Sequence, residues 1–501
     1  MELVFQEQRQ EYLCRILCDT VSQEQTADVV IPDSIPDADR VVDAFGTLLV
    51  RSEECGADSA QAAGSVLVGA IFVDESGTPY SVKTEIPFSV RRDFPKQEND
   101  CYMQCRCTLK SVDARLLNSR KVLIRVGISC TLQVFSPRIQ THYDISEPAE
   151  TLQLQRRELP MRMPMGLGER SFSVNEELDL PEGKNSISRL LKCLYRPIIS
   201  EQRMVGSKAV FKGELLVHAL YEDSEQKLCT WQWNVPFSQY AELDRELDEG
   251  DLQTFLTLTS AETEPDTQYE SRRLLLSAGL LAQCLTVGTQ NVKLISDAYC
   301  TDAELTPQWD TWEMNGLLDR QTFRETAVFE GEQDADSIVD AWMYRDEAET
   351  SRDVDELVLT MLMNCNVLYY DGEGNLQGKT LRPTAKLSTA LAQQAGCEIS
   401  EVTEGELYCS ANRNQLTLRM PMDITLDSVA MQEIKAVCGG SIEPFEGISG
   451  HRPSVILRRT DEENSVWEIG KQFHTPVREI LSANQLDGET VPENRLLLIP
   501  V

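Results

Sequence analysis

An internal repeat constrains this chain more than any other feature of its sequence. When the 501 residues are shifted by about 149 positions, matching residues recur without a gap, and a shift of about 297 positions finds a third copy. The first shift matches Pro32 with Pro181, Arg40 with Arg189, Gly64 with Gly213, Asp74 with Asp223 and residues 86–89 with 235–238, and the second matches residues 41–45 with 338–342 and 74–77 with 371–374. The repeat predicts three related units, residues 1–149, 150–298 and 299–447, followed by a separate C-terminal module, residues 451–501.

The pattern within a copy is typical of β-strands. Two hairpins are expected in the first copy, the first from residues 66–73, 74–77 and 80–86 and the second from residues 101–112, 117–120 and 121–135. One short helix is expected over residues 37–44. Six or more strands with one short helix indicate a β-sandwich or a partly open barrel, so we predict a mainly β chain with three tandem domains of this kind. Whether the copies pack together or move on linkers such as residues 438–441 stays open.

The charge balance argues against some classes of partner. The chain carries 81 acidic and 47 basic residues, a net charge of −34, which would repel nucleic acids and anionic membrane surfaces. No apolar run approaches the roughly eighteen residues that a transmembrane helix needs. The first nine residues lack the basic and apolar segments of a secretory signal. We therefore expect a cytoplasmic protein, with no membrane insertion and no nucleic acid as partner.

The cysteines and histidines form no motif for catalysis or metal binding. Fifteen cysteines are scattered without CxxC pairs, as in a reducing compartment. Cys101, Met103, Cys105 and Cys107 alternate along the sequence, which favours a buried strand face over a metal cluster. The four histidines lie near no nucleophile motif, and neither HExxH nor a phosphate-binding glycine loop is present. The expectation is a protein that is not an enzyme and that uses no metal or cofactor.

The last fifty residues have a different pattern: strand, helix, helix, strand. Residues 454–459 are rich in branched apolar side chains and end at a polar cluster, as a strand does. Ser465 is a suitable N-cap for a first helix. Thr475 can cap a second helix, with Pro476 in its first turn. Residues 496–499 then return as a strand, so a small β-α-α-β domain is expected.

This module resembles the LysM domain, a small β-α-α-β domain that binds carbohydrate. The resemblance rests on residues 464–469, 475–481, 483–486 and 491–500. It implies a peptidoglycan ligand, an N-acetylglucosamine glycan. Glycan-binding LysM domains usually carry glycines in the loops before the first helix and before the last strand, where a sugar chain approaches the backbone. Glu463 and Glu493 occupy those places here, which favours a protein partner over a glycan.

The three repeats resemble the SPOCS domain. The resemblance rests on residues 29–37, 41–42, 80–89 and 112–122 of the first copy and on residues 178–184 and 187–191 of the second, while the third copy diverges most. SPOCS repeats followed by a LysM domain are the arrangement of the SipL-like family of spore-coat morphogenetic proteins. Membership would imply a scaffold of the mother-cell cytoplasm, at the forespore surface. It would bind the coat basement-layer ATPase, stage IV sporulation protein A, and other coat proteins.

Three functional hypotheses follow. The first is a non-enzymatic scaffold that docks through the LysM-like module, the second is a peptidoglycan-binding envelope protein, and the third is a cell-wall hydrolase, for which no catalytic motif is found. The residues expected to contact a partner are Val455, Glu462, Glu463, Asn464, Trp467, Asp487, Gly488, Pro492, Glu493 and Asn494. Trp467 can serve as core or as interface anchor. Trp309 and Trp312 can pack a core edge or face a partner.

Overall fold

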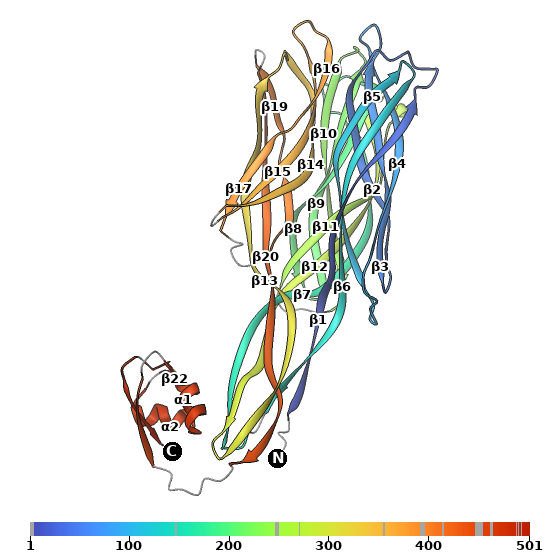
Figure 1. Cartoon of the computed structure of the whole chain (residues 1–501). Coiled ribbons are helices and arrows are strands. Elements are labelled where there is room, and N and C mark those ends of the chain that lie inside the picture. The colour runs from blue at the N-terminus through green and yellow to red at the C-terminus, as the bar shows by residue number, and fades with distance from the viewer. Residues whose placement is uncertain are drawn as a thin grey trace.

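The structure is built almost entirely of β-strands, which confirms the predicted mainly β class (Figure 1). The computed structural model describes residues 5–145, 148–245, 250–269, 271–353, 356–390, 396–412, 415–445, 454–460, 464–486, 488, 490–491 and 493–500. Two α-helices occur in this part of the chain, both in the C-terminal module. Each has eight residues, too few for a helix that crosses a membrane.

The first unit has two three-stranded sheets. Its strands are β1 (Gln6–Val30), β2 (Arg40–Cys55), β3 (Ser59–Val73), β4 (Pro79–Asp93), β5 (Tyr102–Asn118) and β6 (Lys121–Asp144). The sheets have the orders β1-β6-β5 and β2-β3-β4, and both predicted hairpins, β3 with β4 and β5 with β6, are confirmed. The helix predicted over residues 37–44 is wrong. Strand β2 begins at Arg40, because the β-branched Val41 and Val42 favour extended backbone and pack on the core.

In the described residues, the second unit repeats this order of six strands, and the third unit has eight strands. The second contains β7 (Leu152–Asp179), β8 (Ile187–Val205), β9 (Lys208–Asp223), β10 (Leu228–Leu243), β11 (Asp251–Pro265), a 3-10 helix η1 (Thr267–Tyr269) and β12 (Arg273–Cys300). The third contains β13 (Ala303–Glu332), β14 (Ser337–Asp353), β15 (Glu356–Tyr370), β16 (Leu376–Leu381), β17 (Thr384–Thr389), β18 (Gly396–Glu404), β19 (Tyr408–Asn412) and β20 (Gln415–Pro444). In every unit the first strand pairs with the last, as β1 with β6, β7 with β12 and β13 with β20.

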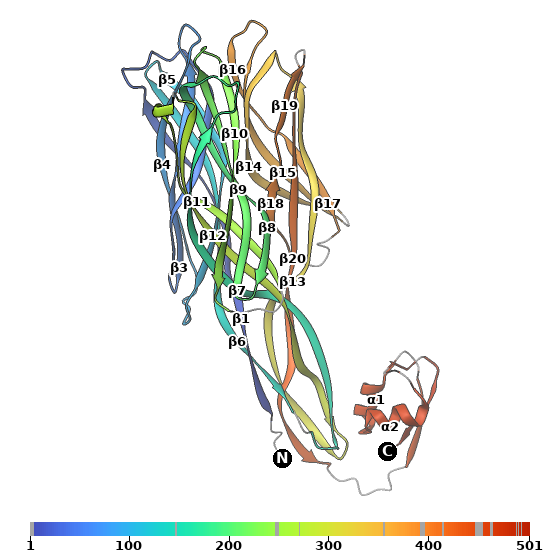
Figure 2. The ribbon, with the colours of Figure 1, turned by 180° about the vertical axis from the view of Figure 1, so that it is seen from behind.

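These paired first and last strands extend beyond the rest of each unit as two-stranded ribbons. Figures 1 and 2 show the three ribbons side by side; we call them the shaft, and the remaining part of the three units the body. Apolar side chains from all three ribbons fill the shaft, among them Met161, Met163, Val292, Leu294, Ile434 and Ala436. Residues 438–441, a possible linker by sequence, belong to β20, in which residues 439–441 pair with β13 and Cys438 lies at a bulge of the ladder. The copies are therefore packed together and are not joined by a free segment at that point.

Three buried charged residues connect the units in the body. Asp43, Lys192 and Asp340 occupy the same position of the three copies, and each follows a β-bulge in its strand. Lys192 Nζ lies 2.7 Å from Asp43 Oδ2 and 2.5 Å from Asp340 Oδ2. His218 Nε2 lies 2.7 Å from Asp340 Oδ1. The three charged side chains are at most 2% exposed, so the copies meet around one common ion cluster.

The pKa values in this cluster follow from burial and from the neighbouring charges. Burial alone would raise the pKa of Asp340, but Lys192 and His218 outweigh it and lower that pKa. Burial alone would lower the pKa of Lys192, but the two carboxylates raise it. Burial raises the pKa of Asp43 in spite of its bond to Lys192. Lys192 is therefore charged at neutral pH, and its charge is compensated inside the protein.

A pair of repeated glycines has a common structural reason. A Cβ atom at Gly64 would lie 2.0 Å from the carbonyl oxygen of Leu49, and a Cβ atom at Gly213 would lie 2.0 Å from that of Ile198. Leu49 and Ile198 lie on the neighbouring strands β2 and β8 and are themselves 149 positions apart in the sequence. The shift of 149 positions therefore aligns the two glycines and also the two carbonyl groups that leave no room for a Cβ atom beside them.

The C-terminal module has two short sheets and two helices. Its elements are β21 (Val455–Arg459), β22 (Asn464–Ser465), α1 (Val466–Phe473), α2 (Val477–Asn484), β23 (Thr490–Val491) and β24 (Leu496–Pro500). As predicted, Ser465 caps α1, its Oγ accepting a hydrogen bond from the Trp467 amide at 3.2 Å. The cap predicted for the second helix is wrong. Pro476 is the N-cap of α2, and Thr475 Oγ1 instead donates to the Pro500 carbonyl at 2.7 Å.

Candidate functional site

The outward face of the sheet formed by β21 and β24 is an exposed apolar strip. Successive residues of a strand point to opposite faces, so Ile456, Leu497 and Ile499 pack inward against the helices. The outward residues are exposed instead, Val455 by 46%, Leu457 by 64% and Leu496 by 62%. Cross-strand pairing places them together, Val455 opposite Pro500, Leu457 opposite Leu498 and Arg459 opposite Leu496. We call Val455, Leu457, Leu496, Leu498 and Pro500 the strip.

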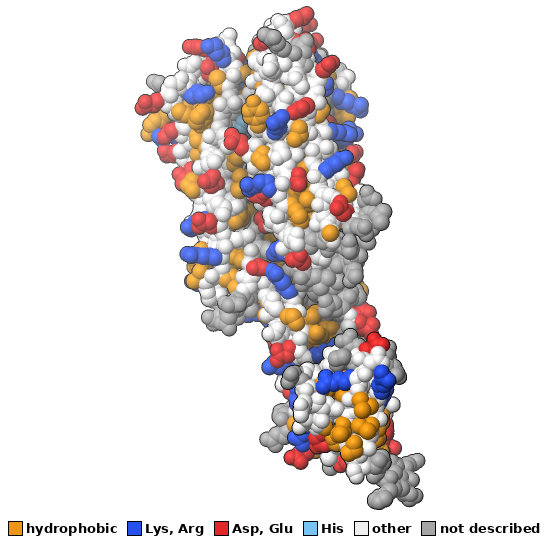
Figure 3. All heavy atoms as spheres, turned by 90° about the vertical axis from the view of Figure 1, so that its left-hand side faces the viewer, with side chains coloured by type: hydrophobic (Ala, Val, Ile, Leu, Met, Phe, Trp, Pro, Cys, Tyr) orange, Lys and Arg blue, Asp and Glu red, His pale blue; other side chains and the backbone are white. Residues whose placement is uncertain are grey.

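One basic residue shares the face of the strip. Neither β21 nor β24 contains an acidic residue, and Arg459 lies opposite Leu496 on the outward face, while Arg458 points toward α1. Figure 3, seen from the side of the module, shows a hydrophobic patch on it with Lys or Arg side chains nearby. This composition differs from that of the whole chain, with its net charge of −34. The strip therefore suits an apolar partner surface that carries acidic side chains.

Trp467 lies on the side of the module that faces the shaft. Its side chain is 8% exposed, because the ring packs edge to face on Tyr299 of β12 with 4.9 Å between ring centroids. Its Nε1 donates to Asp297 Oδ2 at 2.9 Å. Trp467 is therefore buried at an interface, and in this structure that interface lies between the module and the shaft of the same chain.

Further contacts join α1 to the tip of the shaft. Lys471 Nζ lies 2.7 and 2.8 Å from the two carboxylate oxygens of Asp297. The Tyr299 hydroxyl donates to the Thr475 carbonyl at 2.8 Å, and His474 Nδ1 donates to the Cys300 carbonyl at 2.9 Å. We call these contacts the latch: Asp297, Tyr299 and Cys300 of β12 with Trp467, Lys471, His474 and Thr475 of the module.

The other predicted site residues lie in or beside the module's loops. Glu462, Glu463, Asp487 and Pro492 lie outside the described residues, and of Asn464 only the backbone is described, paired with Val491 in the β22–β23 ladder. Gly488, Glu493 and Asn494 are exposed. Asn494 has a left-handed backbone, φ 61°, and its amide donates to the Thr460 carbonyl at 2.7 Å. The structure therefore places a turn at Asn494.

Sequence reasoning missed four of the five strip residues, all but Val455, and every latch residue except Trp467. Leu457 and Leu496 alternate with buried residues, so the period of two along each strand was an available signal. Asp297 and Tyr299 had no such signal, since they lie about 170 positions before Trp467 in another unit. Of the two tryptophans near the third unit, Trp312 packs in the shaft core. Trp309 is 36% exposed beneath the Lys435 ammonium.

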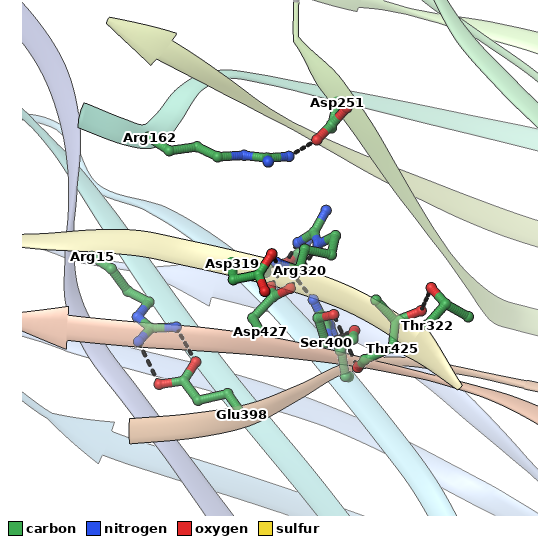
Figure 4. A network of polar contacts seen from close by, with 12 residues as sticks. Arg15, Arg162, Asp251, Asp319, Arg320, Thr322, Glu398, Ser400, Thr425 and Asp427 are labelled. Carbon is green, nitrogen blue, oxygen red and sulfur yellow. Dashed lines mark hydrogen bonds and ion pairs between the residues drawn. The ribbon is translucent and has the colours of Figure 1, made fainter. Parts of the chain in front are cut away.

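A second candidate is a polar cavity of about 670 Å³ between the second and third units. Figure 4 shows the network beside it. Arg320, which lines the cavity, makes two bonds of 2.6 Å to Asp427, and Asp251 pairs with Arg162. Arg15 of the first unit similarly makes two bonds of 2.6 Å to Glu398 of the third. The Arg320–Asp427 and Arg162–Asp251 pairs lie within the third and second units, and the Arg15–Glu398 pair joins the first unit to the third. Each charge is compensated by a partner in the protein, which is the arrangement of a structural contact.

The strand face predicted from Cys101, Met103, Cys105 and Cys107 is buried only in part. Met103, Cys105 and Leu109 of β5 are buried, whereas Cys107 is half-buried and Cys101 precedes the strand. Cys107 Sγ lies 2.8 Å from Cys130 Sγ on the paired strand β6. Within the described residues, no group of three or more His, Cys, Asp or Glu side chains is arranged to hold a metal ion.

Comparisons of the chain with protein-family models, with curated proteins and with solved structures found no match. The SPOCS and LysM resemblance therefore remains an expectation from the sequence.

Proposed function

We propose that this chain is a non-enzymatic scaffold that docks on another protein through the strip of its C-terminal module. The observation that carries the proposal is the strip itself, three large apolar side chains exposed by 46 to 64% on one sheet face. Isolated exposed apolar residues are ordinary on soluble proteins, but a contiguous group flanked by polar residues marks an interaction surface. The expected residue Val455 belongs to this group.

The sequence resemblance suggests the identity of the partner. The SPOCS-like repeats followed by a LysM-like module resemble the clostridial protein SipL, so the proposed partner is stage IV sporulation protein A, the coat basement-layer ATPase at the forespore surface, with other coat proteins. Two further features fit a protein partner better than a glycan. The strip carries aliphatic side chains with Arg459 beside them, and Glu493 is exposed where a glycine would admit a sugar chain.

The test measures binding of the full chain to two baits, purified stage IV sporulation protein A and peptidoglycan sacculi. Leu457→Asp and Leu496→Asp should each weaken binding to the protein at least about tenfold, since each places a carboxylate in the apolar contact. Ile139→Asp is the matched control, because Ile139 is 60% exposed on the shaft, and it should bind as the parent chain does. Retention on sacculi without retention on the protein would replace the scaffold with the peptidoglycan-binding function.

A further inference from the structure

The latch closes the α1 face of the module. The Tyr299 ring of the shaft packs on the Trp467 ring, which is 8% exposed in the closed latch. A tryptophan with an amphipathic ring at the rim of a small domain is a common anchor of protein interfaces. When the latch is closed that anchor is already in use, whereas the strip on the opposite face stays open.

The shaft has features that position it for contact with α1. Asp297 follows a register shift in the pairing of β12 with β7, and such a bulge redirects side chains at the end of a ribbon. Its carboxylate accepts from the Trp467 indole and from the Lys471 ammonium. The helix approaches closely at Gly470, where a Cβ atom would lie 2.4 Å from the Tyr299 hydroxyl. A larger residue at position 470 would hold α1 away from the shaft.

The polar contacts of the latch can be replaced by contacts with water, so the latch can open. The Lys471 side chain is 44% exposed and that of Asp297 is 18% exposed, so salt screens their attraction in part. Its other polar contacts include the bond from the Trp467 indole to Asp297 and two hydrogen bonds to backbone carbonyls, those of Thr475 and Cys300. Each of these groups can exchange its bond for one with water when the module leaves the tip.

We propose that the tip of the shaft is an intramolecular docking site for α1, and that it competes with an outside protein partner for the Trp467 face of the module. The partner aspect rests on the proposed function. A partner that contacts both the strip and Trp467 must first open the latch, so its apparent affinity is its intrinsic affinity multiplied by the fraction of open molecules.

The closed state is tested without any partner, by fluorine NMR of the full chain labelled with 5-fluorotryptophan. Trp467→Phe identifies the Trp467 resonance among those of the six tryptophans. Asp297→Ala should move that resonance to a solvent-exposed position, and Asp297→Asn, which keeps an acceptor for the indole but loses the charge opposite Lys471, should move it part of the way. Lys471→Arg should leave it in place. Asp423→Ala, which removes the ion pair with Arg324 elsewhere, is the matched control.

An unchanged Trp467 resonance in Asp297→Ala would refute the docking site, whatever the partner does. The competition is tested next, by titrating stage IV sporulation protein A onto the parent chain and onto Asp297→Ala. Release of the latch should tighten binding about tenfold, the equivalent of one charge-assisted hydrogen bond. Equal affinities would overturn the competition while leaving the docking site intact. No binding by the parent chain or by the open variant would instead count against the proposed function.

Discussion

Removal of Lys192 should destabilise the body more than any exposed substitution. The Lys192→Met variant keeps a long side chain but leaves Asp43 and Asp340 as two buried carboxylates without their cation. Both carboxylates are about 2% exposed, and the ammonium lies within 2.7 Å of each. Removing one partner of a buried ion pair costs about 3–5 kcal/mol. Because two acceptors lose their partner here, the expected loss is at the upper end, about 5 kcal/mol.

Urea denaturation of the full chain, followed by circular dichroism, measures this loss. Lys212→Met is the matched control, since Lys212 pairs with Glu201 on the surface with 53% and 70% exposed side chains, and it should cost less than about 1 kcal/mol. The triple variant Asp43→Asn, Lys192→Met, Asp340→Asn should recover most of the loss, because no buried charge is left.

Acid should also reduce the effect of Lys192→Met. Without the cation, burial raises the pKa of both carboxylates, so the folded variant takes up protons at a higher pH than the unfolded chain does. The loss in free energy of unfolding, relative to the parent chain, should therefore be largest at neutral pH and become smaller toward pH 4. A Lys192→Met chain within 1 kcal/mol of the parent at neutral pH, or a triple variant as unstable as the single one, would refute the reasoning.

Two further predictions concern the joints between and within the units. Burial, together with the charge of Glu169, raises the pKa of Glu53 to about 7, above its ordinary value of 4.5. A raised carboxyl pKa penalises folding at pH values above it and not below the unfolded value. Glu53→Gln should therefore stabilise the chain at pH 8 and have little effect at pH 4, as thermal melts at both values would show; equal effects at both would contradict the assignment. Gly213→Ala should cost more than about 2 kcal/mol, because its Cβ would meet the Ile198 carbonyl. Gly56→Ala, whose Cβ has no neighbour nearer than 3.6 Å, should cost far less in the same urea titration, and similar losses would show that crowding is not the cause.

The sequence predicted local β pairing well. Both hairpins of the first unit have a turn between two alternating segments, and a turn of that kind determines which strands pair. The helix predicted over residues 37–44 is wrong because the adjacent Val41 and Val42 favour extended backbone. The repeat aligned Asp43 with Asp340 and with Lys192, but an alignment says only that positions correspond. It does not say that corresponding positions of three units meet in one place.

The candidate site likewise has one part that local sequence predicts, the strip, and one part that it does not, the latch. The strip follows from alternation within two five-residue strands, so it could be derived from local sequence. The latch could not, because its two halves are separated by about 170 residues and its geometry depends on a bulge in β12. Contacts of this kind depend on the placement of whole units, which residue periodicity does not encode.

The length of the shaft would determine how far the body lies from a surface to which the module is attached. In β7, the shaft portion from residues 152 to 163 pairs with β12, and at about 3.3 Å per residue these twelve residues span about 40 Å. A chain held by its module would therefore keep its body about 40 Å from the point of attachment. Neighbouring chains attached in this way would form two tiers, slender shafts below and broad, acidic bodies above, with solvent-filled space between the shafts. The lateral spacing of such a layer would be limited by repulsion between bodies, and it should tighten as salt concentration rises.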